Sequence, residues 1–288
     1  MMAMAAALML AACETVYVES GKMDAGLVSE ADSMQKKVIV FDIGPGSVSH
    51  EPMTRADLGS LGLTDLWLVD FVDGVKRQVI HQSGDDDGFG SLKVSLSYGR
   101  HKIAVVASRG SDPQVSEDGS TITWGKPSDT FWVSEELEVT ASTAAAHPLV
   151  LRRVATRLKV QLNDEIPANA SKLVITPETW YYGLTVADGS GTAAKNQSRP
   201  VSIPTSYIGT SGQMVCSIFG LSPSEGWQTD INLKLVDEDD TELGSATVKG
   251  ATFSQNISTV FTGYILKKNL TSQITANDSW GDDNTGQW

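Results

Sequence analysis

Strict alternation of apolar and polar side chains constrains this chain more than any other feature of its sequence. Residues 91–98 read SLKVSLSY, so that every second side chain is apolar and the others are polar. Successive side chains of a β-strand point to opposite faces, and this pattern therefore predicts a strand with one buried and one solvated face. Gly99 and Arg100 interrupt the pattern, and residues 101–107 are expected to return as the second strand of a hairpin.

Short segments of strand character recur along the chain, separated by Gly, Asp, Ser and Pro. They are residues 38–43, 65–72, 75–80, 121–124, 131–139, 172–176, 213–219, 231–236, 243–248 and 259–267. No segment keeps an apolar period of 3.6 residues over three turns. Residues 151–162 would also fit a helix, but Pro148 and Pro167 bracket them and favour a strand. Many short strands with turns between them predict an all-β fold of sandwiches.

The length of the chain and a change in composition suggest where it divides. A chain of 288 residues can bury one large core or two of ordinary size. Residues 140–148 are mostly small and end in Ala-Ala-Ala-His-Pro, which is typical of a boundary. We therefore expect an N-terminal β-sandwich domain over residues 38–147 and a C-terminal one over residues 148–288. Residues 13–37 are polar and aperiodic, as expected of a flexible spacer.

The first residues predict export and a lipid anchor. Residues 1–12 contain only Met, Ala and Leu, and they are too few to span a bilayer, which takes about 20 apolar residues. They suit a signal peptide, and Leu-Ala-Ala-Cys13 has the form of a bacterial lipobox. The thiol of Cys13 would take the lipid, and the small residues before it would admit the signal peptidase. The alternative is a buried apolar segment with an incidental cysteine.

The charge of the chain excludes two classes of partner. It has 22 basic and 35 acidic residues, a formal net charge of -13 and a pI near 4.7. Nucleic-acid binding needs clustered Lys and Arg, so no nucleic-acid partner is expected. Anionic lipid would repel the chain as well, and attachment to the outer membrane would have to run through the lipid on Cys13. Cys216 is expected to be a small buried residue of a strand.

A search for catalytic or metal-binding patterns finds none. The four histidines, His50, His81, His101 and His147, lie far apart and match no metal-ligand spacing. There is no nucleophile elbow and no phosphate-binding loop. The acidic runs at residues 85–87 and 237–240 could bind calcium, but solvated turns are the favoured interpretation. We expect a protein that is not an enzyme and holds no cofactor and no metal.

Aromatic and basic clusters supply the remaining candidates. Trp180, Tyr181 and Tyr182 could form an exposed platform for a sugar or partner, or could belong to the core. Trp288 ends a stretch rich in Gly, Asp and Asn, and we expect it to dock on its own domain or on a partner, since burying a Trp is favourable. A further cluster is expected to be a solvated strand face that balances the acidic charge, and it consists of Arg152, Arg153 and Arg157.

The order of these features resembles the fimbrillin superfamily of Bacteroidales-type surface pili, and within it the branch of minor subunits and anchors. The resemblance runs roughly from Cys13 to the end of the chain. Its pieces are the lipobox, the early strand 38–43 with MTRA at 53–56 behind it, LWLVDF at 66–71, FGSL at 89–92 running into LSYGRH at 96–101, and LRRVATRL at 151–158 leading to Ile166-Pro167.

This resemblance implies two tandem transthyretin-like β-sandwich domains and assembly by strand addition between subunits. In polymerising members a protease cuts after an arginine behind the first strand, and a strand of the next subunit fills the groove that opens. Here the leaving strand would be residues 38–43, the cut would follow Arg55, and the donor would lie within residues 259–288. Anchor members keep the first strand, because a cut after Arg55 would release the body from its lipid.

Two functions therefore remain open. The first is a fimbrial subunit or fimbrial anchor lipoprotein at the outer cell surface, with other fimbrial subunits as partners and a host protein or glycan as a further one. The second is a surface glycan-binding lipoprotein that uses exposed aromatics. A removable first strand would favour the first function, and exposure of Trp180, Tyr181 and Tyr182 in a row would favour the second.

Overall fold

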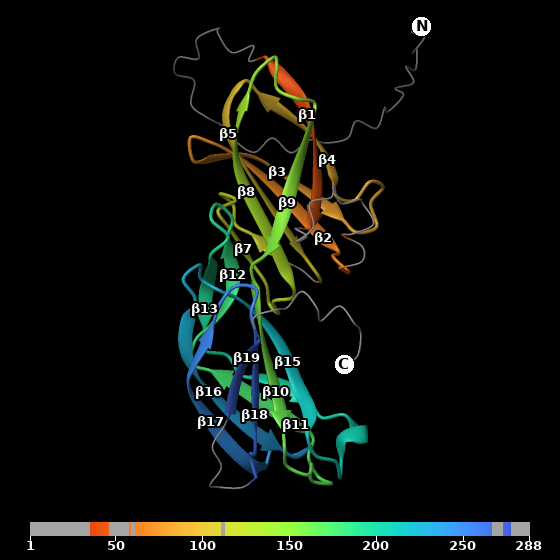
Figure 1. The fold of residues 1–288 in the computed structure, drawn as a ribbon, viewed down its shortest axis with the longest axis vertical. Coiled ribbons are helices and arrows are strands. Elements are labelled where there is room, and N and C mark those ends of the chain that lie inside the picture. Colours follow the sequence, from red (N-terminus) through yellow and green to blue (C-terminus); the bar gives the residue numbers. More distant parts are fainter. Residues whose placement is uncertain (1–34, 46–57, 59–60, 111–112, 267–272, 278–288) are drawn as a thin grey trace, which may run out of the picture. The chain divides into compact units, whose positions relative to one another are not determined.

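β-Strands make up almost all of the regular structure. The computed structural model describes residues 35–45, 58, 61–110, 113–266 and 273–277, and within these ranges it has nineteen strands and the short 3-10 helix η1 (Thr205–Tyr207) (Figure 1). No helix in the described part of the chain is long and apolar enough to cross a bilayer. The predicted all-β class is confirmed.

The first sandwich is built from seven strands in the order β3-β2-β5-β8-β9-β1-β4. Their bounds are β1 (Lys36–Pro45), β2 (Asp65–Val72), β3 (Val75–Ser83), β4 (Ser91–Ser97), β5 (Gly99–Ser108), β8 (Thr130–Val139) and β9 (Ala146–Arg153). β8 and β9 pair at residues 131–132 and 152–153, where the sheet divides into two layers. Side chains of both layers form one core, among them Ile39 of β1, Leu68 of β2, Val94 of β4 and Leu149 of β9.

The second sandwich faces two four-stranded sheets across a second core. One sheet has the order β15-β10-β18-β19 and the other β14-β11-β16-β17. Their bounds are β10 (Ala155–Leu162), β11 (Lys172–Pro177), β14 (Arg199–Ser202), β15 (Gln213–Leu221), β16 (Trp227–Val236), β17 (Glu242–Phe253), β18 (Ser258–Gly263) and β19 (Gln273–Asn277). Leu158, Ile175, Leu233 and Phe261 lie in this core.

A small third sheet connects the two sandwiches. Its order is β13-β12-β7-β6, with β6 (Gln114–Val115) and β7 (Thr121–Thr123) from the first half of the chain and β12 (Trp180–Thr185) and β13 (Gly191–Lys195) from the second. A third apolar cluster lies here, and in it Trp132 Nε1 donates to the carbonyl oxygen of Val186 at 2.7 Å. Residues 35–288 form one compact unit, so the division between residues 147 and 148 stays a prediction.

The alternating segments fold as their patterns predict. Leu92, Val94 and Leu96 of β4 are buried and the residues between them are more exposed. Residues 151–162 are strand rather than helix, but they form two strands in different sheets, because the chain passes from β9 to β10 at Val154. The strands that sequence reasoning missed, β6, β12, β13, β14 and β19, are short and show little alternation.

Candidate strand-addition site

The first strand of the chain lies inside its sheet. β1 pairs antiparallel with β4, from Lys36 opposite Ser97 to Asp42 opposite Ser91. On its other side it pairs parallel with β9, from Val40 opposite Ala146 to Pro45 opposite Leu151 (Figure 1). A segment that precedes all its neighbours in sequence is therefore hydrogen-bonded on both sides. The predicted strand at residues 38–43 exists, and it is a central strand and not an edge strand.

Alternate side chains of β1 fill the core of the first sandwich. Ile39 and Phe41 are fully buried, and Ile43 is 6% exposed. Val38, which points to the opposite face, is 45% exposed. Burying an apolar side chain of this size is worth about 1.5–3 kcal/mol, so the three together hold β1 strongly in place. The strand is attached by side-chain packing as much as by its backbone.

Polar contacts fix the register of β1 at its ends. Ser91 Oγ donates to Asp42 Oδ1 at 3.0 Å, and Lys37 Nζ donates to the carbonyl oxygen of Ala141 at 2.6 Å. The ring of His147 on β9 meets the ring of Phe41 edge to face, with centroids 5.7 Å apart. These contacts pair the strand with specific residues of both neighbours, so a shift by one residue would misplace every buried side chain.

The arrangement would allow β-strand exchange, in which β1 leaves the sheet and another strand takes its place. Without β1, the facing edges of β4 and β9 would lose their backbone partners, and the core would open where Ile39, Phe41 and Ile43 lie. An incoming strand could restore the hydrogen bonds and could place its own alternate side chains in the same three positions. The groove would thus select for a strand with apolar residues at every second position.

Three of the predicted site residues lie outside the described residues: Cys13, Arg55 and Trp288. Lipidation, cleavage and docking at these positions stay predictions. Within the predicted donor region, residues 259–288, β18 lies between β10 and β19, and Phe261 of β18 is buried in the core. β19 pairs with β18 and is the outer strand of its sheet.

The aromatic cluster is not an exposed platform. Trp180 is fully buried and Tyr182 is 1% exposed, and both belong to the second core. Trp180 packs edge to face against Trp227 and Phe253, with centroids 5.4 and 5.0 Å apart. Tyr181 points to the other face of β12 and is half-buried. Because the three residues alternate along one strand, they do not form one exposed row, and for Trp180 and Tyr182 the structure agrees with the core alternative.

The arginine cluster is also less solvated than predicted. Arg153 Nε and Nη2 donate to the two carboxylate oxygens of the buried Asp129 at 2.8 and 3.2 Å. Arg157 is 8% exposed and lies over the ring of Phe219. Arg152 alone of the three is exposed, and its guanidinium lies 4.7 Å from the ring centre of Trp132. Asp129 gave no sequence signal, because its partner follows 24 residues later.

Cys216 is buried as predicted. It is 3% exposed, and burial raises the pKa of its thiol to about 12. The sequence pattern predicts Cys216 on the same strand face as Met214. In the structure, Cys216 lies opposite Val160 of β10 and Met214 lies opposite the next residue, Gln161, so β15 has a bulge at this point. Val215 and Cys216 are therefore both buried although they are adjacent.

A buried contact between a histidine and a carboxylate in the first sandwich escaped sequence reasoning. His101 Nδ1 donates to Asp70 Oδ1 at 2.7 Å, and both side chains are 2% exposed. His101 Nε2 lies 2.9 Å from the carbonyl oxygen of Ser97 and 3.3 Å from its hydroxyl. The three side chains resemble a Ser-His-Asp arrangement, and His101 and Asp70 are both buried. Among the described residues, no three His, Cys, Asp or Glu side chains gather as a metal site would need.

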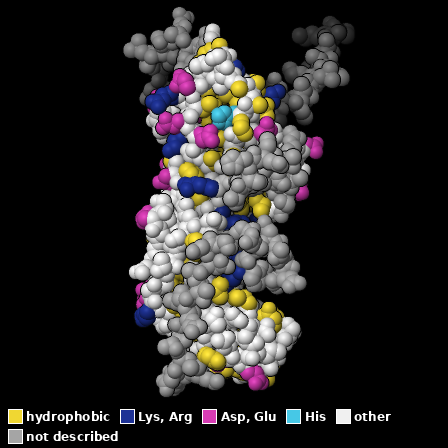
Figure 2. Space-filling model, in the orientation of Figure 1, with side chains coloured by type: hydrophobic (Ala, Val, Ile, Leu, Met, Phe, Trp, Pro, Cys, Tyr) yellow, Lys and Arg dark blue, Asp and Glu magenta, His cyan; other side chains and the backbone are white. Residues whose placement is uncertain are grey.

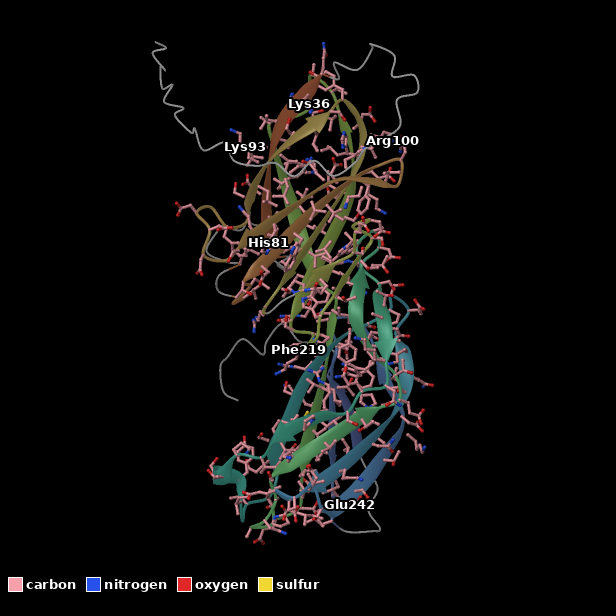
Figure 3. All side chains as sticks on the ribbon, turned by 180° about the vertical axis from the view of Figure 1, so that it is seen from behind. Lys36, His81, Lys93, Arg100, Phe219 and Glu242 are labelled. Carbon is pink, nitrogen blue, oxygen red and sulfur yellow. The ribbon has the colours of Figure 1, made fainter. Side chains whose placement is uncertain are left out.

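On the face that Figure 2 shows, acidic and basic side chains are interspersed and do not separate by sign. Figure 3, from behind, shows Phe219 of β15 at the level where the second sandwich meets the first, and its ring packs against the junction cluster. Glu242 lies at the far end of the second sandwich.

No protein-family model and no curated protein matches the sequence. Solved structures do match. A candidate adhesin from Bacteroides ovatus aligns at a TM-score of 0.51 and 12% identity, over 79% of this chain and 88% of that one. A candidate polysaccharide-binding protein from Bacteroides thetaiotaomicron aligns at 0.51 and 10%, over 84% and 96%. A candidate cell adhesion protein from Parabacteroides distasonis aligns at 0.50 and 9%, over 85% and 99%.

These proteins share an all-β architecture with this chain over most of their length, at identities too low for sequence comparison to find. This likeness is one of fold: the chain shares its architecture with Bacteroidales proteins that include candidate adhesins, as the predicted resemblance implies.

Proposed function

We propose that this chain is a structural and adhesive component of a bacterial fimbria, either a subunit or the anchor, and that it joins its neighbours by β-strand addition. The observation that carries the proposal is the position of β1 between β4 and β9, with Ile39, Phe41 and Ile43 in the core. The shared fold with candidate adhesion proteins supports an adhesive role. The two sandwiches are proposed to be tandem transthyretin-like domains.

The proposal includes the place of the protein in the cell. A lipid on Cys13 would hold the chain at the outer membrane, on the cell surface, without any enzymatic activity or cofactor. Partners would be other fimbrial subunits, and a host protein or glycan would be a further one. In an anchor, β1 stays in its sheet and the chain remains tethered. In a polymerising subunit, cleavage after Arg55 frees β1, and a strand of the next subunit replaces it.

The donor strand is assigned to the C-terminal part of the chain. Within residues 259–288, β19 is the strand whose release would disturb the second sandwich least, because it lies at the edge of its sheet. β18 supplies Phe261 to the core and pairs on both sides, so its release would open the sandwich. We therefore propose that the donor segment begins after β18.

Intact mass and N-terminal sequencing of the protein from the cell surface separate the two roles. A chain that begins at a lipid-modified Cys13 supports the anchor. A chain that begins at Ala56 and is recovered in large assemblies supports the polymerising subunit. A chain that begins at neither residue contradicts both routes.

A peptide-binding experiment tests the groove directly. A chain of residues 56–288 is prepared, and a peptide with the β1 sequence of residues 36–45, KKVIVFDIGP, is added. We expect the peptide to bind and to raise the unfolding temperature. A peptide with Phe41→Asp is the matched control and should not bind, because its charge would enter the core. Equal binding of both peptides, or of neither, would contradict the proposal.

The glycan-binding alternative loses its sequence support. It rested on three exposed rings, and Trp180 and Tyr182 are buried. One protein of similar fold is a candidate polysaccharide-binding protein, so the fold is compatible with glycan binding. Among the described residues, however, Tyr98 is the one aromatic side chain that counts as an exposed large hydrophobic, at 37%. The fimbrial role is therefore preferred.

A further inference from the structure

Among the strands that the structure describes, none pairs with the outer edge of β4. β4 pairs with β1 on one side and ends the sheet on the other. In an antiparallel pair, alternate residues direct their backbone groups toward the partner strand and away from it. The carbonyl of Gly90 and the N–H of Tyr98 bond the β1 segment, at Ile43 and Gln35. The odd-numbered residues of β4 therefore direct their backbone groups toward the free edge.

Side chains from the opposite layer reach the carbonyls of this free edge. Gln82 of β3 accepts from the N–H of Gly90 at 3.0 Å through Oε1, and its Nε2 donates to the carbonyl oxygen of Ser91 at 3.3 Å. Gln78 of β3 donates to the carbonyl oxygen of Ser95 at 3.4 Å. A primary amide has N–H donors like a peptide group, so the Nε2 groups of Gln78 and Gln82 each stand in for an N–H of a missing strand.

The buried histidine belongs to the same set. His101 Nε2 lies 2.9 Å from the carbonyl oxygen of Ser97, and Asp70 holds the other ring nitrogen. Gln78 Nε2 also reaches Asp70 Oδ2, at 3.4 Å, which joins the histidine and the glutamine in one network. Three of the four odd-numbered carbonyls of β4, at residues 91, 95 and 97, thus meet a side chain from β3 or β5.

The second sandwich repeats the device at the equivalent strand. β15 stands beside β10 at the edge of its sheet, as β4 stands beside β1. The carbonyl oxygen of Phe219 on β15 accepts from Trp180 Nε1 at 2.9 Å and from Arg199 Nη1 at 3.3 Å. Arg199 begins β14, which holds the same place in the second sandwich as β3 in the first. Different side chains therefore cover the equivalent edge in each of the two sandwiches.

An uncovered strand edge invites pairing with other chains, and proteins blunt such edges in several ways. We propose that Gln78, Gln82 and His101 are specificity-determining residues that close the free edge of β4 to incoming strands. This inference rests on the proposed function, because a closed edge at β4 would confine strand addition to the groove that β1 fills. A protein displayed at high density would otherwise pair edge to edge with its own copies.

The test uses the full chain with Gln78→Ala and Gln82→Ala together. Light scattering measures self-association, and amide exchange by NMR locates it. We expect the dissociation constant for self-association to fall at least about tenfold, with exchange at the Lys93 and Ser95 amides slowed at high protein concentration. Each single substitution is measured in parallel, so a double variant that fails to fold does not decide the question.

Gln228→Ala is the matched control. Gln228 lies on β16, and its Nε2 contacts the hydroxyl of Thr252 at 3.4 Å and no free edge. This variant should stay as monomeric as the unaltered chain. Folded Gln78 and Gln82 variants that self-associate no more than the control would overturn the proposal. The measurement needs neither the β1 peptide nor a partner subunit, so its failure is distinct from failure of the groove.

Discussion

The two sandwiches use the same order of strands but differ in how their first strand is held. In the first, one layer is β3-β2-β5-β8 and the other is β9-β1-β4; in the second, the layers are β14-β11-β16-β17 and β18-β10-β15, with β19 added. β1 and β10 hold equivalent places, each antiparallel to one neighbour and parallel to the last strand of its own seven.

The connections of these two strands decide which one could leave. β10 follows β9 through the single residue Val154, so it is tied to the first sandwich at one end and to β11 at the other. β1 is separated from β2 by residues 46–64, and every strand with which it pairs follows it in sequence. The difference shows that equal pairing does not mean equal attachment. A strand can be exchanged when one cut frees it from the rest of its sandwich.

The two sandwiches also differ in whether their layers are joined by backbone pairing at the last two strands. β8 and β9 pair through their backbones. Their equivalents, β17 and β18, leave a cavity of about 190 Å³ whose lining includes Val160, Val248, Phe261 and Ile265. The second sandwich compensates with β19, which pairs with β18 along residues 258–262.

The largest expected effect comes from substitutions in the two equivalent strands. Phe41→Ala in β1 and Leu158→Ala in β10 each remove a fully buried side chain, and each should cost about 3–5 kcal/mol of unfolding free energy in urea. Only the Phe41→Ala chain should then take up an added peptide of residues 36–45, because β1 is the strand that we propose to be exchanged. Val38→Ala, on the exposed face of β1, is the control and should cost under about 0.5 kcal/mol. Equal peptide uptake by both variants would contradict the proposed difference between β1 and β10.

A smaller effect is expected where the sandwiches meet. Trp132→Phe keeps most of the ring but removes the N–H that donates to Val186, which should cost about 1–2 kcal/mol. Since that bond joins the two halves of the chain, thermal unfolding should separate into two transitions. Trp227→Phe removes a bond to Thr179 within the second sandwich and is the control. A single transition in both variants would argue that the halves unfold together without this bond.

The reactivity of Cys216 tests whether the second sandwich closes by itself. Burial raises the pKa of this thiol to about 12, so it is almost wholly protonated and unreactive at pH 8. In a Cys13→Ser chain, a thiol reagent should react at least about 100-fold more slowly than after unfolding. The same protection should persist in a chain of residues 56–288, which lacks β1. Loss of protection there would show that the second sandwich depends on the first strand.

The smallest effect is expected at the turn between β6 and β7. Hydrogen bonds from the Ser116 hydroxyl, and from the backbone and hydroxyl of Ser120, lower the pKa of Asp118 from 3.8 to about 2. Because the folded pKa is depressed, the turn is fully stabilised above about pH 4 and loses this contribution as the pH falls through 2. The Ser120 amide resonance should shift in that window, and Asp118→Asn should remove the shift. A midpoint near pH 4 would contradict these hydrogen bonds.

Local sequence patterns were enough to predict several strands, both half-buried ones such as β4 and fully buried ones such as β2. The alternation of residues 91–98 predicted β4, and residues 65–72 predicted β2 with the bounds that the structure has. Cys216 was predicted correctly as a buried residue. These features depend on side chains close together in sequence, whose period follows directly from strand geometry.

The partners of each strand, and the polar groups that meet, follow only from the tertiary fold. Trp180 and Tyr182 suggested a surface platform, but β12 places them in the core, and Arg153 was expected to be solvated, but Asp129 lies 2.8 Å from it. Gln78 and Gln82 carry no sequence signal, because their role exists only where β3 stands opposite the edge of β4. Pairing across sheets joins residues far apart in sequence, so local patterns cannot encode it, and the same long-range pairing makes β1 the candidate for exchange.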